Sequence, residues 1–201
     1  MFWGRAMPET DTKRSVAVMI KRPLLAGAFA ATAAAAPGAA DAATDIFLRL
    51  DGIPGESTDV NHKDQIEILS FSLGFVNRPA GGAAGSGAGK VSCGDVALTK
   101  SIDKSSPPLI GAVTTGKHIK SGVLFFTTAS GKATQDYYVL TLSDLLVTAL
   151  QQSDSAGGPK VTEQVTISAT KFKFEYKQQK ADGSLGAAQT FTFDCKLNKA
   201  G

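Results

Sequence analysis

The segment of this chain that comes nearest to a chemical motif is residues 111–117 (GAVTTGK). Its spacing is that of a phosphate-binding loop, in which glycines and a lysine surround a phosphate and a following Ser or Thr hydroxyl holds magnesium. Here His118 stands where that hydroxyl is needed. A phosphate loop also leads from a strand into a helix, whereas here a predicted helix leads into a strand. We therefore interpret Gly116 as the residue that ends a helix, and not as part of a nucleotide site.

The side chains that could supply nitrogen and sulfur ligands to zinc are His62, His118, Cys93 and Cys195. No two of them have the close sequence spacing that structural zinc sites use. A cysteine–histidine nucleophile pair would need a third residue to orient the histidine, and none can be named from the sequence. The sequence thus predicts no enzyme, no metal site and no cofactor. Surface histidines together with a disulfide account better for these four residues.

The first 42 residues have the layout of a secretory leader. Lys21 and Arg22 form a basic start, an apolar and alanine-rich run follows at 23–36, and the small residues Ala40 and Ala42 stand at the two positions that a signal peptidase reads. The apolar run is too short to span a bilayer. These features predict cleavage of the leader and export of the protein to the periplasm or the cell exterior.

Residues 43–201 would form one exported domain that is long enough to bury a core. The whole chain has a net charge of +3, but the basic excess lies largely in the leader, so the domain itself is nearly neutral. A nucleic-acid-binding surface needs clustered Lys and Arg, which a nearly neutral domain does not favour. No further apolar run approaches membrane length. We therefore expect neither nucleic-acid binding nor insertion into a membrane.

The cysteine count is two, Cys93 and Cys195. An even number of cysteines in an exported protein favours a disulfide. Closing a loop of about 100 residues would stabilise the fold by roughly 4–5 kcal/mol, because it lowers the entropy of the unfolded chain. Two separate buried thiols are the alternative. The predicted leader favours the disulfide.

Alternating apolar residues and frequent turn dipeptides predict a domain that is mainly β. One short helix is expected from Ser105 or Ser106, with two prolines that suit its first turn, to Gly116. The predicted strands lie at 44–50, 65–75, 96–102, 122–129, 135–142, 161–177 and 191–197, and a turn at 130–132 joins two of them as a hairpin. Short strands, frequent turns and a single helix predict a small antiparallel β-barrel, or tight sandwich, with one short α-helix packed against it.

Two of these strands change the face that carries their apolar residues. In the strand 65–75 the change follows Ile68, which predicts a β-bulge at residues 69–70. The strand 161–177 shows the same change near its middle. Residues 142–150 carry leucines at helical spacing, so that the pattern alone predicts a helix there.

Four blocks of the sequence, in order and with compatible gaps, resemble the haemolysin-coregulated protein (Hcp) family of type VI secretion. They include the runs GIPGES, IEILSFSLG, TKSIDKSSP and KQQKADG, and they span residues 47–57, 66–91, 99–118 and 140–183. The resemblance implies a β-barrel with one helix packed against it, and subunits that form six-membered rings. Stacked rings would form a tube whose lumen holds small effector proteins. The resemblance also favours a strand over a helix at 142–150.

The resemblance further implies places in a ring for particular residues. Ser72 and its strand would face the lumen, and the loops at 52–64 and 78–90 would form ring-to-ring contacts. A flexible loop suits stacking, because it can become ordered against the strand edges of the next ring. Spike proteins would be further partners beside the effectors. The candidate stacking residues are Gly55, Glu56, Ser57, His62, Gly82, Gly85, Gly87 and Gly89.

The leader and the cysteine pair depart from the family pattern, because tube subunits normally leave the cytoplasm through the secretion machine. Two functions follow for such a chain. It is a structural protein that self-assembles into hexameric rings and carries partners in their lumen, or it is an exported monomeric β-barrel that binds an envelope or host partner. The oligomeric state distinguishes the two.

Overall fold

The computed structural model describes residues 44–77, 89–130, 133–154 and 160–201. The predicted leader and residues 131–132 of the predicted turn lie outside these ranges. In this part of the chain the helix is α1 (Ser106–Thr115), and the strands are β1 (Ile46–Leu50), β2 (Ile66–Ile68), β3 (Ser70–Ser72), β4 (Phe75–Asn77), β5 (Val91–Cys93), β6 (Val96–Ser101), β7 (His118–Ser130), β8 (Ala133–Ser153), β9 (Thr162–Gln179), β10 (Leu185–Asp194) and β11 (Lys199–Ala200).

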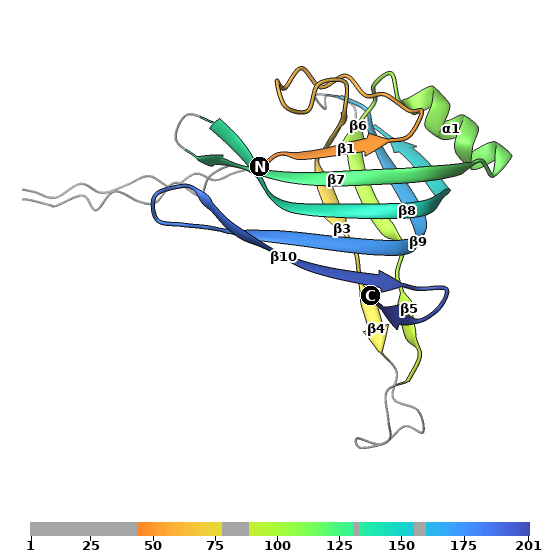
Figure 1. The fold of residues 1–201 in the computed structure, drawn as a ribbon. Helices are drawn as coiled ribbons and strands as arrows, with labels where there is room; N and C mark the ends of the chain where they lie inside the picture. Colours follow the sequence, from red (N-terminus) through yellow and green to blue (C-terminus); the bar gives the residue numbers. More distant parts are fainter. Residues whose placement is uncertain (1–43, 78–88, 131–132, 155–159) are drawn as a thin grey trace, which may run out of the picture. The chain divides into compact units, whose positions relative to one another are not determined.

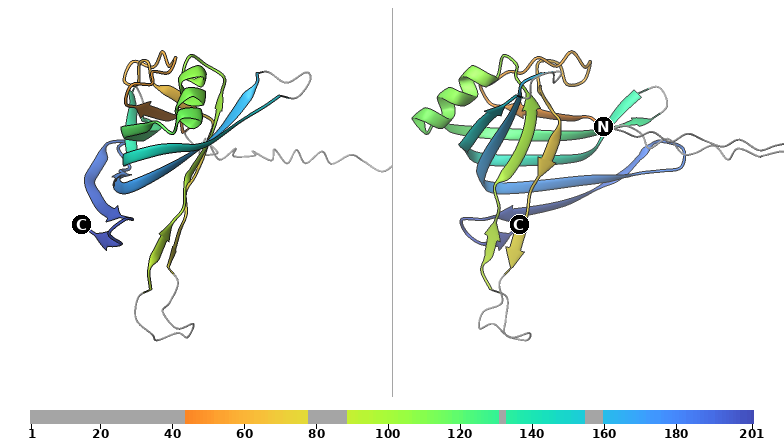
Figure 2. Two further views of the ribbon diagram at one scale, coloured as in Figure 1. Left: turned by 90° about the vertical axis from the view of Figure 1, so that its right-hand side faces the viewer. Right: turned by 180° about the vertical axis from the view of Figure 1, so that it is seen from behind.

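Nine of the strands form one antiparallel sheet with the order β11-β10-β9-β8-β7-β1-β2, while β6 pairs with β9 and with β3 (Figure 1). Strands β3 and β6 cross β7 at a steep angle (Figure 2), and β6 runs alongside the first part of β9. The hydrogen-bonded order is open, but β2 continues into β3 through Leu69, whose amide donates to the Thr99 carbonyl at 2.7 Å. The covalent chain thus links the β1 side of the sheet to β6. The prediction of a small β-barrel with one helix is confirmed, with the bend at Leu69 where a bulge was predicted.

Strand β9 changes its partner near Thr170. Its first residues, up to Ile167, pair with β6, and its residues from Lys171 onward pair with β10. The buried face changes at the same place, since Ile167 is buried before it and Phe172 after it. The change of face that the sequence showed in this strand therefore marks the position where two parts of the sheet diverge.

Residues 142–150 belong to strand β8, so the strand implied by the resemblance is correct and the helix indicated by leucine spacing is wrong. Asp144 adopts a left-handed conformation, with φ of 54°. The pairing of β8 with β9 then shifts register between Val147 and Ala149. These two irregularities change which side chains face the core, and they give an extended strand the residue spacing of a helix.

Helix α1 begins and ends where the sequence predicts. Pro107 and Pro108 lie in its first turn, and Gly116 follows it with φ of 62°, a conformation that glycine adopts without strain. Its buried residues include Leu109 and Ala112, and the helix packs against β8. The Ser105 side chain makes no capping hydrogen bond at the N-terminus.

The last long strand ends earlier than predicted. Strand β10 stops at Asp194, and the residues that follow form a turn. Cys195 therefore lies in a turn that packs against the core cluster, and not within a strand. Leu197, which lies within the strand predicted at 191–197, belongs to this turn and is exposed.

A close backbone approach explains one glycine of the loop between β1 and β2. A Cβ atom on Gly55 would lie 2.2 Å from the Gln65 carbonyl oxygen, whereas a Cβ on Gly111 of α1 would meet nothing within 4 Å. We expect Gly55→Ala to lower the free energy of unfolding by about 1–3 kcal/mol, because the loop must shift. Gly111→Ala should raise it by about 0.5–1 kcal/mol. Urea denaturation of both variants checks this, and equal effects of the two substitutions would contradict it.

Candidate assembly site

Two charged side chains lie inside the barrel where β6 meets β9. Lys100 and Glu163 face each other across the two strands, only 1% and 0% exposed, and their Nζ and Oε2 atoms are 2.9 Å apart. The Ser106 hydroxyl donates to the same Glu163 oxygen at 2.7 Å, and the Gln152 amide donates to the other at 2.6 Å. Lys100 also contacts the Asp103 carboxylate at 2.8 Å. The start of helix α1 is thereby bonded to two strands.

The protonation state of Glu163 follows from these contacts. Burial disfavours its charged form, but hydrogen bonds from Ser106, Gln152 and Lys100 together outweigh burial and hold the pKa of Glu163 below its usual value. Sequence analysis did not single out this pair. A signal was present, because Lys100 and Glu163 share the alternation of the buried residues Leu98 and Val165.

The loop at 52–64, predicted to make ring-to-ring contacts, is shaped by its buried residues. Gly55, Ser57 and His62 are buried, whereas Glu56 is exposed. The Glu56 carboxylate accepts the Lys104 amide at 2.8 Å, which links the loop to the segment before α1. Of the candidate stacking residues in this loop, only Glu56 therefore lies on its surface.

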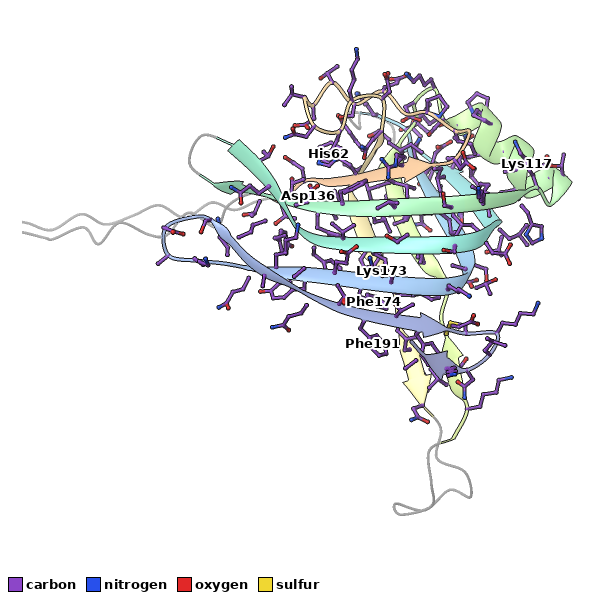
Figure 3. All side chains as sticks on the ribbon, viewed as in Figure 1. His62, Lys117, Asp136, Lys173, Phe174 and Phe191 are labelled. Atoms are coloured by element: carbon purple, nitrogen blue, oxygen red, sulfur yellow. A yellow bond between two sulfur atoms is a disulfide. The ribbon has the colours of Figure 1, made fainter. Side chains whose placement is uncertain are left out.

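His62 was predicted to lie on the surface, and this prediction is wrong, since His62 is 3% exposed. Its ring stacks on Phe47 with centroids 4.5 Å apart. One ring nitrogen lies 3.0 Å from the Asp136 carboxylate on β8, and the other lies 3.3 Å from the Gln65 side chain (Figure 3). His62 therefore fastens the loop to the sheet. His118 is exposed, as predicted.

The other positions implied by the resemblance are spread over the domain. Ser72 is exposed on β3, opposite Ala97 of β6. Gly89 lies two residues before Val91, the first residue of β5, and is half-buried. The candidates Gly82, Gly85 and Gly87 lie outside the described residues. A lumen-facing role for Ser72 and a stacking role for these loops stay predictions.

Strands β4 and β5 form a separate two-stranded sheet, which we call the arm (Phe75–Asn77 and Val91–Cys93). It extends away from the rest of the domain (Figure 1). A disulfide joins Cys93, the last residue of β5, to Cys195 in the turn after β10, with Cα atoms 6.2 Å apart. The Val91 amide also donates to the Asn198 side chain at 2.9 Å. The arm is thus attached to the C-terminal turn.

An apolar cleft of about 490 Å³ lies between the arm side and the long strands; its lining residues are Phe71, Leu73, Phe75, Val91, Tyr138, Phe174, Phe191 and Phe193. Phe191 is 51% exposed and stacks at 6.3 Å on Phe174 of the neighbouring strand (Figure 3). Burial, with a smaller effect of Tyr137, raises the pKa of Tyr138, which is the one residue of the lining with a polar side chain. A cluster of exposed aromatic side chains of this kind is typical of a protein–protein contact.

The cleft adjoins an open strand edge. Strand β11 pairs only with Phe193 and Asp194 of β10. In the described part of the chain, the outer edge of β10 from Leu185 to Phe191 therefore has no partner strand. Such an edge can pair with a strand of another molecule.

Among the described residues, no group of three or more His, Cys, Asp or Glu side chains is arranged to hold a metal ion. None of the described helices is both long and apolar enough to cross a membrane.

The class of protein follows from comparison with known proteins. Residues 47–176 match the family described as "Type VI secretion system effector, Hcp". Protein hcp1 of Pseudomonas aeruginosa is 37% identical over 143 residues, which cover 71% of this chain and 88% of that protein. The crystal structure of Hcp1 from Salmonella typhimurium is 36% identical, with a TM-score of 0.67, over 79% of this chain and 99% of that one. A further type six secretion system protein is 27% identical, with a TM-score of 0.74, over 79% and 100%.

The chain belongs to the Hcp family of type VI secretion proteins. This confirms the resemblance, and the structural matches confirm the fold that it implied.

The buried pair yields a prediction about stability. Removing one partner, as in Lys100→Met or Glu163→Gln, leaves polar groups buried without their contacts, and we expect it to lower the free energy of unfolding by about 3–5 kcal/mol. The exposed pair Lys104–Asp64, with a contact distance of 3.0 Å, is the control. Lys104→Met should change the stability by about 1 kcal/mol or less. Equal losses in urea denaturation for the buried and the exposed pair would contradict this.

The same pair sets a dependence on pH. The pKa of Glu163 is lower in the folded than in the unfolded protein. Its contribution to the free energy of unfolding is therefore full above the pKa of the unfolded chain, about 4.3, and is lost as the pH falls through the pKa of the folded protein. We expect Glu163→Gln to be less stable than the parent at neutral pH and to lose less stability on acidification. Parallel stability curves between pH 6 and 2.5 would show that Glu163 does not contribute.

The disulfide yields a second prediction about stability. Cys93 and Cys195 are 102 residues apart in sequence, and we expect Cys195→Ser to destabilise the oxidised protein by roughly 4–5 kcal/mol in the chain-entropy treatment. Thermal melting with and without a thiol reductant measures this. The reductant should bring the parent close to the variant. Equal melting of parent and variant without reductant would show that the bond does not stabilise the fold.

Proposed function

We propose that this protein is an exported ring-forming subunit of the Hcp type, which self-assembles into hexamers that can stack and hold partner proteins in their lumen. The observation that carries the proposal is the exposed aromatic cleft beside the open edge of β10, on a fold that the chain shares with Hcp proteins. Family membership supports the assembly, since Hcp proteins form hexameric rings and tubes.

The cleft suits contact with a second copy of the chain. A cyclic ring is built from head-to-tail contacts, in which each subunit presents two different surfaces. The cleft and the β10 edge together offer one such surface, with aromatic residues for burial and unpaired main-chain groups for hydrogen bonds. Phe191 is the central contact in this proposal, because it belongs to the apolar lining of the cleft and half of its side chain is exposed.

Stacking of rings would use the exposed part of the loop at 52–64. Gly55, Ser57 and His62 hold its shape from within, so the contacts themselves would come from side chains such as Glu56 and Val60. Val60 is 89% exposed and is therefore open to contact with a neighbouring ring. Ser72 on β3 would face the lumen.

Export through the predicted leader would place the assembled protein outside the cytoplasm. The disulfide supports this, because such bonds form and persist in oxidising compartments. Hcp proteins are secreted by the type VI system, and this chain would use the leader as its own route across the inner membrane.

Light scattering after size exclusion tests the assembly, on the purified oxidised protein. We expect a mass six times that of the monomer. Phe191→Ser should raise the dissociation constant of the contact between subunits by about tenfold or more, because a central aromatic contact is lost. Leu69→Ser is the matched control, since Leu69 is 61% exposed but lies outside the cleft.

A monomeric parent would contradict the proposed ring and favour an exported barrel that binds an envelope or host partner. A ring that survives Phe191→Ser but is lost with Leu69→Ser would show that the subunits meet through a different face.

A further inference from the structure

The last residue of β10 and the turn that follows it, residues 194–198 together, are firmly attached to the barrel. The Cys195 amide donates to the Thr170 carbonyl of β9 at 2.9 Å, at the place where β9 changes its partner. The Asp194 carboxylate accepts the Leu197 amide at 2.9 Å and lies 3.1 Å from the Lys171 ammonium group. We call this segment the clasp. It offers a fixed point on the barrel, while the arm that it holds is a separate small sheet.

The arm meets the clasp and the barrel through three kinds of contact. The Cys93–Cys195 disulfide is the covalent one, and the Val91 amide donates to Asn198 of the clasp. The Phe75 ring of the arm packs edge-on against Phe172 of β9, with centroids 5.2 Å apart. A two-stranded hairpin is marginally stable on its own, so the position and order of the arm depend on these contacts.

The Cys93–Cys195 disulfide joins two segments that line the aromatic cleft. Phe75 and Val91 of the arm form part of one wall, and Phe191 and Phe193 of β10 form part of the other. The disulfide joins the end of the first wall to the end of the second. Both cysteines are partly exposed, so that a thiol can reach them from solvent.

We propose that the Cys93–Cys195 pair is a reversible redox lock, which holds the arm on the barrel when oxidised and releases it when reduced. In the oxidised direction the two thiols lose two electrons and two protons, and a thiol–disulfide carrier or a small disulfide accepts them and becomes a dithiol. In the reverse direction a dithiol attacks the bond, leaves as a disulfide and restores both cysteine thiols.

The redox lock makes ring assembly depend on whether the compartment is reducing or oxidising. This consequence rests on the proposed ring function, because the cleft is the surface through which a second copy would bind. Before export the chain is in a reducing environment, its arm is released and the cleft lacks a fixed wall. After export the bond forms, the cleft takes its final shape and the rings assemble.

Hydrogen exchange of the arm tests the lock without reference to assembly. The full-length protein is measured oxidised, after reduction and after reoxidation, under conditions in which it stays folded. Main-chain amides of β4 and β5 should exchange about tenfold faster or more after reduction and recover on reoxidation. Amides of β7 and β8 in the barrel core should stay far slower than those of the arm in all three samples, although the lower global stability of the reduced protein speeds their exchange as well. The Cys93→Ser/Cys195→Ser variant is the control, and its arm should exchange fast with or without reductant.

The mass of the same samples by light scattering separates the lock from the proposed function. Fast arm exchange with loss of hexamers on reduction supports both. Unchanged arm exchange overturns the lock, whatever the oligomeric state. Fast arm exchange in a protein that stays hexameric when reduced supports the release but overturns the control of assembly. Fast arm exchange in a protein that is monomeric when oxidised leaves the lock in place and contradicts the ring.

Discussion

The ion pair between Lys100 and Glu163 is the constraint on which the rest of this barrel depends. Both groups lie where water does not reach, so each is tolerable only with the other in place. A slip of one residue between β6 and β9 would turn one charge outward and leave the other buried alone. The pair therefore specifies the register of these strands. Ser106 shares the same carboxylate, so the start of helix α1 is fixed by the same interaction.

Strand β9 carries two different kinds of contact along its length. Before Thr170 it faces β6 and contributes Glu163 to a closed polar network; after it, β9 faces β10 and contributes Phe172 and Phe174 to aromatic packing. In the part of β9 before Thr170, the buried charged and polar side chains are paired within the domain, so this part needs no contact with another molecule. The aromatic end stays partly exposed and has an open strand edge beside it. The barrel is thus rigid and complete on one side, and suited to association on the other.

Much of this fold could be predicted from the sequence, since strand alternation, the helix from 106 to 115 and the bend at Leu69 are local signals. The buried ion pair was missed because charged residues in strands usually face water, and only their position in the alternation differs. His62 was misplaced for a related reason, since its stacking on Phe47 depends on a partner strand. The two irregularities in β8 made a strand look helical. In each case the deciding contact joins residues far apart in the chain, which periodicity does not detect.

The arm shows why a covalent bond is useful at this position. Its two strands have three residues each, and their sheet is separate from that of the barrel. Side-chain burial holds the barrel strands in place from many directions, whereas the arm meets the clasp from one direction only, through Val91 and Cys93. A weak attachment of this kind is sensitive to the loss of a single strong contact. Because the disulfide lies there and not inside the barrel, its reduction lowers the stability of the fold without removing a contact within the barrel core, and in the proposed lock the arm is the element that responds first.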